Sequence, residues 1–291
     1  MDPLESVVTI FNRQICNLTE GNENALGGIV CVWNDRAVAN GDDVMIMNPV
    51  YPGMLAFAER SWRGGGYAGW TATIGEPETE RATAFAEFEN RLLDQKQQYF
   101  KGLDFPYVKQ ADLVWDIYGP YENKGNLSKV FAPESIKFNA LKEKPKYKAT
   151  GGTLVMKHWW APLISGVVEQ PQENTTWYAQ TQIWSDEDKQ REFWIGFNNL
   201  SRSMSTDSPN AGTWNNLKSQ VWVNNELVSP PLWKHPNQKG NLEIPLIDEG
   251  YEFREPTLIS LKKGWNTVKV KLPVASFKGP NWTNPVKWMF T

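Results

Sequence analysis

Gly27-Gly28-Ile29-Val30-Cys31-Val32-Trp33-Asn34-Asp35 is the stretch of this chain that decides the fold. Residues 29–33 form an unbroken apolar run behind two glycines, which is typical of a strand covered on both faces by helices. At its end the chain changes to an amide and a carboxylate. In barrels of alternating strands and helices, the site lies at the C-terminal ends of the strands. Trp33 offers an aromatic face to the C–H side of a sugar ring, and Asp35 accepts hydrogen bonds from sugar hydroxyls.

A helix is expected on each side of this strand. Asp2, Pro3 and Glu5 occupy the cap, the first helical position and the capping-box position of the first helix. Its apolar stripe repeats at helical spacing and consists of Leu4, Val7, Val8, Phe11 and Ile15. The second helix begins at Asn48-Pro49 and ends at the three glycines 64–66. Its apolar positions include Met54, Leu55, Phe57, Ala58 and Trp62.

A third helix is predicted over residues 78–99. Its apolar face consists of Ala82, Phe85, Phe88, Leu92 and Tyr99. The order helix, strand, loop, helix is typical of an α/β barrel. Because an eight-unit barrel takes ~250 residues, residues 1–102 are expected to hold only about one and a half such units and cannot close a barrel alone.

Three motifs of this region occur together in a known family. The Gly-Gly-x-x-x-x-Trp-x-Asp strand, the Asn48-Pro49 pair and the helix motif Ala58-Glu59-Arg60-x-Trp62 resemble the last strand and helix of family 20 glycoside hydrolases, the β-N-acetylhexosaminidases. The resemblance covers roughly residues 2–70. It implies a TIM (β/α)8 barrel that removes terminal N-acetylglucosamine or N-acetylgalactosamine by substrate-assisted retaining hydrolysis.

The family's catalytic Asp-Glu pair follows a His and two glycines, and no His-x-Gly-Gly-Asp-Glu motif occurs in this sequence. No catalytic residue is therefore assigned, and the chain is expected to be the C-terminal part of such an enzyme, inactive by itself. Its expected partners are an N-acetylhexosamine-containing glycan and either the missing N-terminal barrel portion or a second copy of the chain. The parent enzyme is expected to be periplasmic or extracellular.

The resemblance assigns two substrate-binding residues. Trp33 matches the wall under the sugar ring, and Asp35 matches the acidic residue that grips the outer hydroxyls. Many members have glutamate at the position of Asp35, which leaves the reach of this side chain and the preferred epimer open. The alternatives are a barrel-core aromatic for Trp33, and a loop-capping carboxylate or a partner of Arg36 for Asp35. Glu59 and Arg60 fall within a helix among core residues, so a structural ion pair or hydrogen bonds to barrel loops is expected.

After Gly102 the pattern changes from helical to β. The strands expected here are residues 113–118, 177–184, 192–197, 220–223, 257–261, 265–272 and 286–290. In residues 265–272 the alternation is clean, with Val268, Val270 and Leu272 on the inner face and the lysines on the outer face. Strands in this order without intervening helices indicate an antiparallel sandwich. Residues 103–291 resemble the galactose-binding-like jelly rolls appended to bacterial glycosidases, so the expected class is α+β with two domains, 1–102 and 103–291.

The second domain is rich in tryptophan. Of the 15 tryptophans of the chain, candidates for stacking on sugars are Trp159, Trp160, Trp177, Trp214 and Trp233. Burial in a sandwich core or between domains is the commoner fate of tryptophan in such strands. A non-catalytic carbohydrate-binding or structural β-sandwich protein therefore stands as the alternative function. A different barrel glycosidase with a similar final strand is a third possibility.

Composition excludes several other classes. A net charge of −3 and a pI near 5.6 argue against a nucleic-acid partner. No apolar run approaches the ~20 residues that span a bilayer, and the N-terminal residues lack the basic and apolar regions of a signal peptide. Cys16 and Cys31 are expected to be buried thiols rather than a bridge. His158 and His235 have no clustered partners, so neither a zinc site nor a cofactor is expected.

Overall fold

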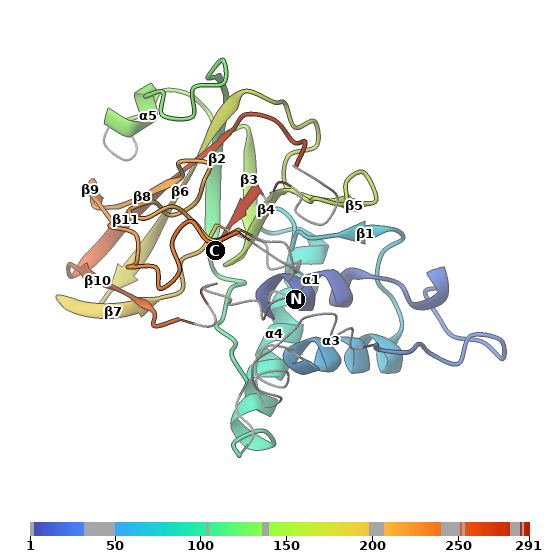
Figure 1. Cartoon of the computed structure of the whole chain (residues 1–291). Coiled ribbons are helices and arrows are strands. Elements are labelled where there is room, and N and C mark those ends of the chain that lie inside the picture. Colours follow the sequence, from blue (N-terminus) through green and yellow to red (C-terminus); the bar gives the residue numbers. More distant parts are fainter. Residues whose placement is uncertain are drawn as a thin grey trace.

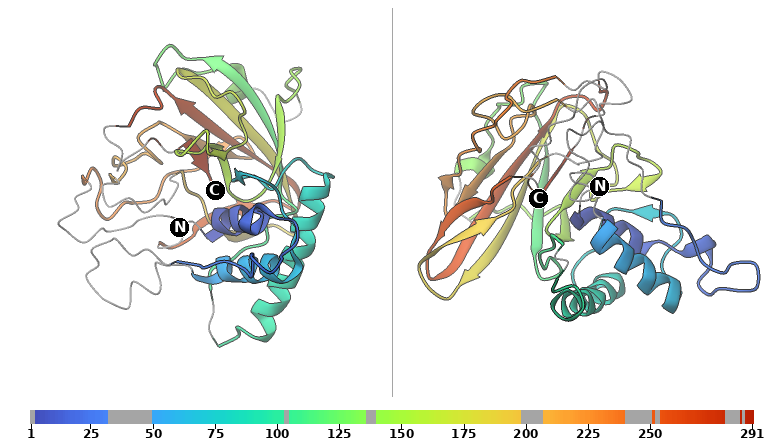
Figure 2. Two further views of the ribbon diagram at one scale, coloured as in Figure 1. Left: turned by 90° about the vertical axis from the view of Figure 1, so that its right-hand side faces the viewer. Right: turned by 60° about the horizontal axis from the view of Figure 1, so that its bottom comes forward.

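The structure is a computed structural model that describes residues 3–31, 50–102, 105–135, 140–197, 207–239, 251, 254–279, 286 and 288–291. Within these ranges the chain has a mixed α+β fold with few helices and a six-stranded antiparallel sheet. Figures 1 and 2 show helices α1, α3 and α4 gathered on one side of the molecule and the large sheet on the other. We call residues 3–102 the helical unit and residues 105–291 the β unit.

The helical unit is built on the apolar stripe of its first helix. Its helices are α1 (Pro3–Asn12), the 3-10 turn η1 (Ile15–Asn17), α3 (Val50–Arg63) and α4 (Glu80–Gln98). Val7, Val8 and Phe11 of α1 are buried as predicted. The ring of Phe11 stacks on Phe88 of α4, with centroids 4.6 Å apart. This aromatic contact, together with neighbouring apolar side chains, makes the core that joins the helices.

Helix α4 confirms the helix predicted over residues 78–99 with slightly shorter bounds. It begins after Thr79, whose hydroxyl accepts a hydrogen bond from the backbone N–H of Ala82 at 3.3 Å. The four buried members of its predicted apolar face are Ala82, Phe85, Phe88 and Leu92. Tyr99 is exposed because it lies one residue beyond the last helical turn.

The strand predicted at residues 29–33 is wrong over its described part. Residues 27–31 have no regular structure, and the Ile29 side chain is 88 % exposed. A strand needs a neighbour to take its backbone hydrogen bonds, and no strand of the described ranges pairs with this segment. The remainder of the run, residues 32–35, lies outside the described residues.

Helix α3 buries a narrower face than its sequence predicts. Its buried residues are Pro52, Gly53 and Ala56, whereas Trp62 is 92 % exposed. The glycines at 64–66 end the helix as expected, with φ of 66°, 72° and 93°, values that glycine adopts at little cost. The predicted start of this helix, Asn48-Pro49, lies outside the described residues.

The β unit is organised around one large sheet with strand order β3-β2-β6-β11-β8-β9. In chain order these strands are β2 (Val114–Glu122), β3 (Tyr147–Thr150), β6 (Thr175–Ser185), β8 (Gln220–Val223), β9 (Glu226–Leu227) and β11 (Gly264–Val274). Two small antiparallel sheets accompany it, one of β4 (Leu154–Lys157) with β12 (Trp288–Phe290) and one of β7 (Lys189–Phe193) with β10 (Thr257–Leu261). All seven predicted strands are present in some form, and those at 220–223 and 257–261 have the predicted bounds.

The small sheets pack against one face of the large sheet, which we call its inner face. Ile117, Ala179 and Leu272 of the large sheet share one buried cluster with Leu154 and Phe290 of the small sheets. A two-layer β core therefore forms the centre of this unit.

The alternation predicted for residues 265–272 is confirmed in β11, with one difference. Val270 and Leu272 lie in the inner core, and Lys269 and Lys271 lie on the opposite, outer face. These lysines are nevertheless 4 % and 1 % exposed, since the segment of residues 129–135 covers them. That segment contains the short helix α5 (Ala132–Ser135), which Figure 1 shows above the large sheet.

The two units are joined by backbone pairing and by a buried carboxylate. Strand β1 (Trp70–Thr71) of the helical unit runs parallel to β5 (Ile164–Ser165) of the β unit. Glu89 of α4 accepts hydrogen bonds from the backbone at Gln110 and Ala111, just before β2. The domain division at residue 102 stays a prediction, and these contacts cross it.

Two further expectations concern cysteines and membranes. Cys16 and Cys31 are free thiols, but both are exposed, so the predicted burial is wrong. Both lie within residues 15–31, a segment with little regular structure. None of the helices in the described ranges is long and apolar enough to cross a bilayer.

Candidate functional site

The sequence-predicted sugar-binding residues, Trp33 and Asp35, lie outside the described residues. The described chain stops at residue 31 before them and resumes with α3 at residue 50. Among the polar residues that the sequence analysis singled out near this region, the structure describes Glu59 and Arg60 of α3.

Arg60 of α3 has a structural role, as its sequence position predicts. Its Nε donates to the carbonyl of Phe11 at 2.8 Å and its Nη1 to the carbonyl of Gly64 at 2.6 Å. The guanidinium also lies over the Phe11 ring, 4.5 Å from the centroid. Arg60 thereby ties the C-terminal ends of α1 and α3 together.

Glu59 likewise forms ion pairs within the helical unit. Its Oε1 lies 3.0 Å from Nη1 of Arg63 and 2.5 Å from Nη2 of Arg91 on α4. Burial acts to raise the pKa of Glu59, but the hydrogen bonds and charges of Arg91 and Arg63 outweigh it and lower that pKa below the usual glutamate value. Glu59 thus forms structural ion pairs with Arg63 and Arg91, while Arg60 donates to backbone carbonyls; the expected hydrogen bonds to barrel loops stay a prediction.

Three of the five tryptophans that are candidates for stacking on sugars pack or form hydrogen bonds within the protein. Trp177 and Trp214 are buried in the β core. Trp233 is half-buried, and its Nε1 donates to the carbonyl of Thr213 at 2.7 Å. Trp177 and Trp214 therefore follow the commoner fate of tryptophan in β structure, because their buried rings are closed to a ligand.

Trp159 and Trp160 form a stack on the loop between β4 and β5. Their rings are parallel within 4°, with centroids 5.3 Å apart, and the His158 ring stacks on Trp159 at 5.6 Å. Nδ1 of His158 accepts a hydrogen bond from the backbone N–H of Trp160 at 3.0 Å, which shapes the loop. Trp160 is 56 % exposed, so part of its indole ring is open to solvent.

A second exposed aromatic pair, not among the sequence candidates, lies at the end of the large sheet. Trp184 of β6 and Trp265 of β11 are direct cross-strand partners, 53 % and 62 % exposed. Their ring centroids are 5.4 Å apart at an interplanar angle of 73°. The alternation of β11 indicates that Trp265 lies on the outer face, because Val268 and Val270 lie on the inner face, but the register that pairs it with Trp184 comes from the folded sheet.

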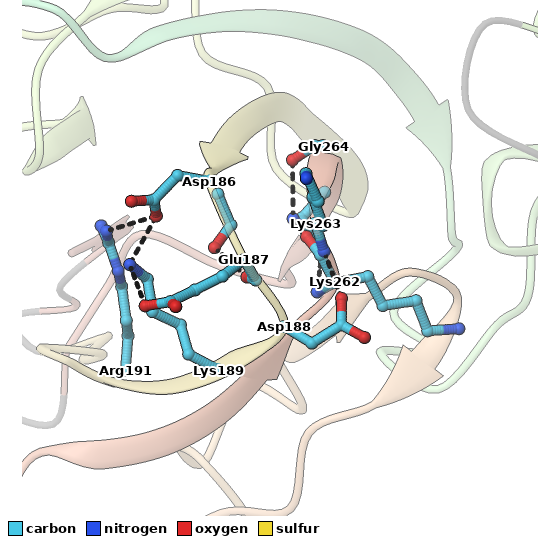
Figure 3. A network of polar contacts seen from close by, with 10 residues as sticks. Asp186, Glu187, Asp188, Lys189, Arg191, Lys262, Lys263 and Gly264 are labelled. Atoms are coloured by element: carbon cyan, nitrogen blue, oxygen red, sulfur yellow. Dashed lines mark hydrogen bonds and ion pairs between the residues drawn. The ribbon is translucent and has the colours of Figure 1, made fainter.

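The turns beside this pair carry a network of charged residues. Figure 3 shows Asp186 and Glu187 facing Lys189 and Arg191 on one side, with Asp188 turned toward the 262–264 turn on the other. Asp186 Oδ1 lies 2.5 Å from Lys189 Nζ, and the hydrogen bond from Lys189 lowers the pKa of Asp186. Asp188 accepts a hydrogen bond from the backbone N–H of Lys263 at 2.6 Å. These contacts fix the turn at the end of β6 and the turn at the start of β11.

The charged residues described above, those of α3 and those of the turns beside β6, form contacts within the protein. The exposed tryptophans Trp160, Trp184 and Trp265 are the side chains suited to binding a ligand. Within the described ranges, no group of three or more His, Cys, Asp or Glu side chains is placed to hold a metal ion. Comparison of the sequence with protein-family models gave no match, and comparison with curated proteins likewise gave none.

Proposed function

We propose that this chain is the C-terminal part of a family 20-like β-N-acetylhexosaminidase, an enzyme that removes terminal N-acetylhexosamine from glycans. In this proposal the helical unit is the end of a TIM (β/α)8 barrel, and the β unit is a galactose-binding-like jelly-roll sandwich that braces it. The observation that carries the proposal is the combination of the Gly27-to-Asp35 motif, Asn48-Pro49 and the Ala58-Glu59-Arg60-x-Trp62 helix in one short region.

The surroundings of α3 support this assignment. Glu59 and Arg60 are held by contacts to α1, α4 and the turn after α3, so the helix motif acts as a scaffold. Ile29 and Trp62 expose large apolar side chains on the same unit. Further strands and helices of a barrel, supplied by the parent enzyme, would cover such surfaces.

The proposed division of chemistry follows from the substrate-assisted mechanism. The acetamido oxygen of the substrate attacks the anomeric carbon, a glutamate protonates the leaving oxygen, and a neighbouring aspartate orients the acetamido group. The parent supplies both carboxylates. Trp33 forms one wall of the sugar subsite, and Asp35 accepts hydrogen bonds from the outer hydroxyls.

Activity of this chain and of an upstream-extended chain tests the proposal. The extended chain should release the chromophore from a chromogenic N-acetylglucosaminide, and this chain alone should not, because it lacks the groups that act in the transition state. Activity of the chain alone, or activity of the extended chain on another class of glycoside, contradicts the proposal.

The alternative is a non-catalytic carbohydrate-binding β protein, and the parallel Trp159–Trp160 stack, in which Trp160 is exposed, favours it. Under this alternative residues 103–291 bind glycans and neither the chain nor its extended form hydrolyses them. Glycan binding together with inactivity of both forms would select it.

A further inference from the structure

The outer face of the large sheet is divided into a covered half and an open half. Over the covered half, the Glu134 carboxylate of α5 accepts a hydrogen bond from the Tyr178 hydroxyl at 2.5 Å and lies 2.7 Å from Nζ of Lys271. Nζ of Lys271 also donates to the carbonyl of Lys129 at 2.8 Å, and Nζ of Lys269 donates to the carbonyl of Pro133. These buried contacts hold residues 129–135 against the sheet.

The open half begins where that covering segment ends. Its outermost members are the cross-strand partners Trp184 and Trp265, and the next pair on the same face is Gln182 with Thr267. Gln182 and Thr267 are half-exposed. Within the described ranges, neither indole N–H, nor the Gln182 amide, nor the Thr267 hydroxyl forms a hydrogen bond to protein.

We propose that this strip, Trp184, Trp265, Gln182 and Thr267, binds a neutral saccharide chain. Indole rings present an apolar face to the C–H side of a pyranose, and the amide and hydroxyl supply hydrogen bonds to its hydroxyl groups. The inference does not depend on the hexosaminidase assignment, because no residue of the strip belongs to the barrel region.

Charge favours a neutral ligand over an ionic one. The four side chains of the strip are uncharged at neutral pH. The carboxylates of the adjoining turn are engaged, with Asp186 and Glu187 paired to Lys189 and Asp188 accepting from the backbone of Lys263. A nucleic acid is further disfavoured by the net charge of −3.

The dimensions of the strip favour a saccharide over a protein partner. The strip is two strands wide, and neighbouring strands lie ~4.8 Å apart, so it matches the width of a single sugar chain. A stable protein interface buries about 800 Å² on each partner, which requires many more residues than these four.

Titration of the full chain with chitohexaose, cellohexaose and maltohexaose tests the proposal. We expect at least one of these to bind, with Trp184→Ala and Trp265→Ala each weakening its affinity at least about tenfold, the loss typical of one anchoring aromatic. Gln182→Ala should weaken it several-fold. Trp62→Ala is the matched control, because it removes an exposed tryptophan of α3 outside the strip, and the affinity of this variant should be unchanged.

Thermal melting and molecular mass in solution complete the test. All four variants change exposed or half-exposed side chains, so their melting temperatures should stay close to that of the native chain. If the melting temperature of a variant is clearly lower than that of the native chain, Trp184→Phe replaces it in the titration. Trp184→Phe should keep part of the affinity for the hexasaccharide. The proposal is overturned if the native chain binds none of the three hexasaccharides, or if the variants of the strip bind as tightly as the native chain and Trp62→Ala do. It is also overturned if the chain is a dimer that Trp184→Ala makes monomeric, or if polygalacturonate binds in place of the neutral probes.

Discussion

Glu89 is the residue whose removal should most weaken the connection between the helical unit and the β unit. Its side chain is fully buried on α4. Oε1 accepts from the Tyr107 hydroxyl at 2.7 Å and from the backbone N–H of Gln110 at 2.8 Å, and Oε2 accepts from that of Ala111 at 3.0 Å. Burial raises the pKa of Glu89, while these three hydrogen bonds act to lower it.

Glu89→Ala removes the acceptor of all three hydrogen bonds and leaves buried donors unpaired. Hydrogen bonds to charged groups contribute about 1.5–3 kcal/mol each, and stranding a buried donor costs about 1–3 kcal/mol, while the buried charge itself is relieved. The balance is a loss of about 3–5 kcal/mol in the free energy of unfolding, the scale seen when one partner of a buried charged pair is removed.

Two control variants remove fewer of these hydrogen bonds and should lose less stability. Glu89→Gln keeps one oxygen for Tyr107 and Gln110 but turns an amide N–H₂ toward Ala111, so about 1–3 kcal/mol should be lost. Tyr107→Phe removes a single hydrogen bond and should cost about 1 kcal/mol.

Urea denaturation, followed by circular dichroism and tryptophan fluorescence, measures these differences. Trp194 of the β unit packs against the core of the helical unit, so the fluorescence of the chain includes a probe at the junction. If Glu89→Ala unfolds within about 0.5 kcal/mol of the native chain, the range of an ordinary surface change, the argument for a buried joining carboxylate is refuted.

Three further predictions concern other parts of the fold. Glu134→Ala leaves the buried Lys271 ammonium without its carboxylate and should lower the free energy of unfolding by about 3–5 kcal/mol. The double variant with Lys271→Met should recover most of that loss. Urea denaturation measures the stability of both variants, and equal losses in the two would contradict the prediction. The lowered pKa of Glu59 means that its stabilisation is complete above the unfolded value and is lost as the pH falls through the folded value. The melting temperature of Glu59→Gln should therefore lie below that of the native chain at pH 7 and approach it at pH 3, and a constant difference would refute the ion pair. Gly64 and Gly69 both have positive φ, but a Cβ at Gly64 would lie 2.5 Å from a backbone carbonyl oxygen, whereas at Gly69 nothing lies within 4 Å. Gly64→Ala should therefore destabilise by more than the ~1 kcal/mol conformational cost expected of Gly69→Ala, and equal melting temperatures would count against the close approach.

Periodic patterns predicted those elements whose partners lie within the described chain. The stripe of Val7, Val8 and Phe11 is buried in α1, and the alternation of Val270 and Leu272 is buried in β11. In both cases the packing partner, α4 or the small sheets, belongs to the same chain. Local spacing is then sufficient to predict both the element and its buried face.

The errors arise where burial depends on distant residues. The apolar residues 29–31 predicted a covered strand, but pairing needs a neighbouring strand, and none of the described strands provides one. Lys269 and Lys271 were expected in solvent, and only the path of residues 129–135 over the sheet buries them. Nothing in the local pattern of either strand indicates what a distant segment will cover.

The candidate-site residues also divide into those whose roles local sequence predicts and those whose contacts depend on distant residues. The structural roles of Glu59 and Arg60 could be predicted, because both fall within a helix whose neighbours are core residues. The exposed pair Trp184 and Trp265 was missed because cross-strand register, which brings the two rings together, is a property of the folded sheet. The positions of Trp33 and Asp35 stay predictions of the sequence.

Hydrolysis of a chromogenic N-acetylglucosaminide by the upstream-extended chain, with and without Asp35→Ala, tests the central claim most directly. If Asp35 accepts a hydrogen bond from a sugar hydroxyl, its removal should lower kcat/KM by about 10- to 150-fold, the equivalent of 1.5–3 kcal/mol for a hydrogen bond to a charged group. Asp42→Ala, which removes a carboxylate seven residues further along the sequence, should leave kcat/KM unchanged. Full activity of Asp35→Ala, or equal losses in both variants, would contradict the account that this chain supplies part of the sugar-binding wall of a hexosaminidase.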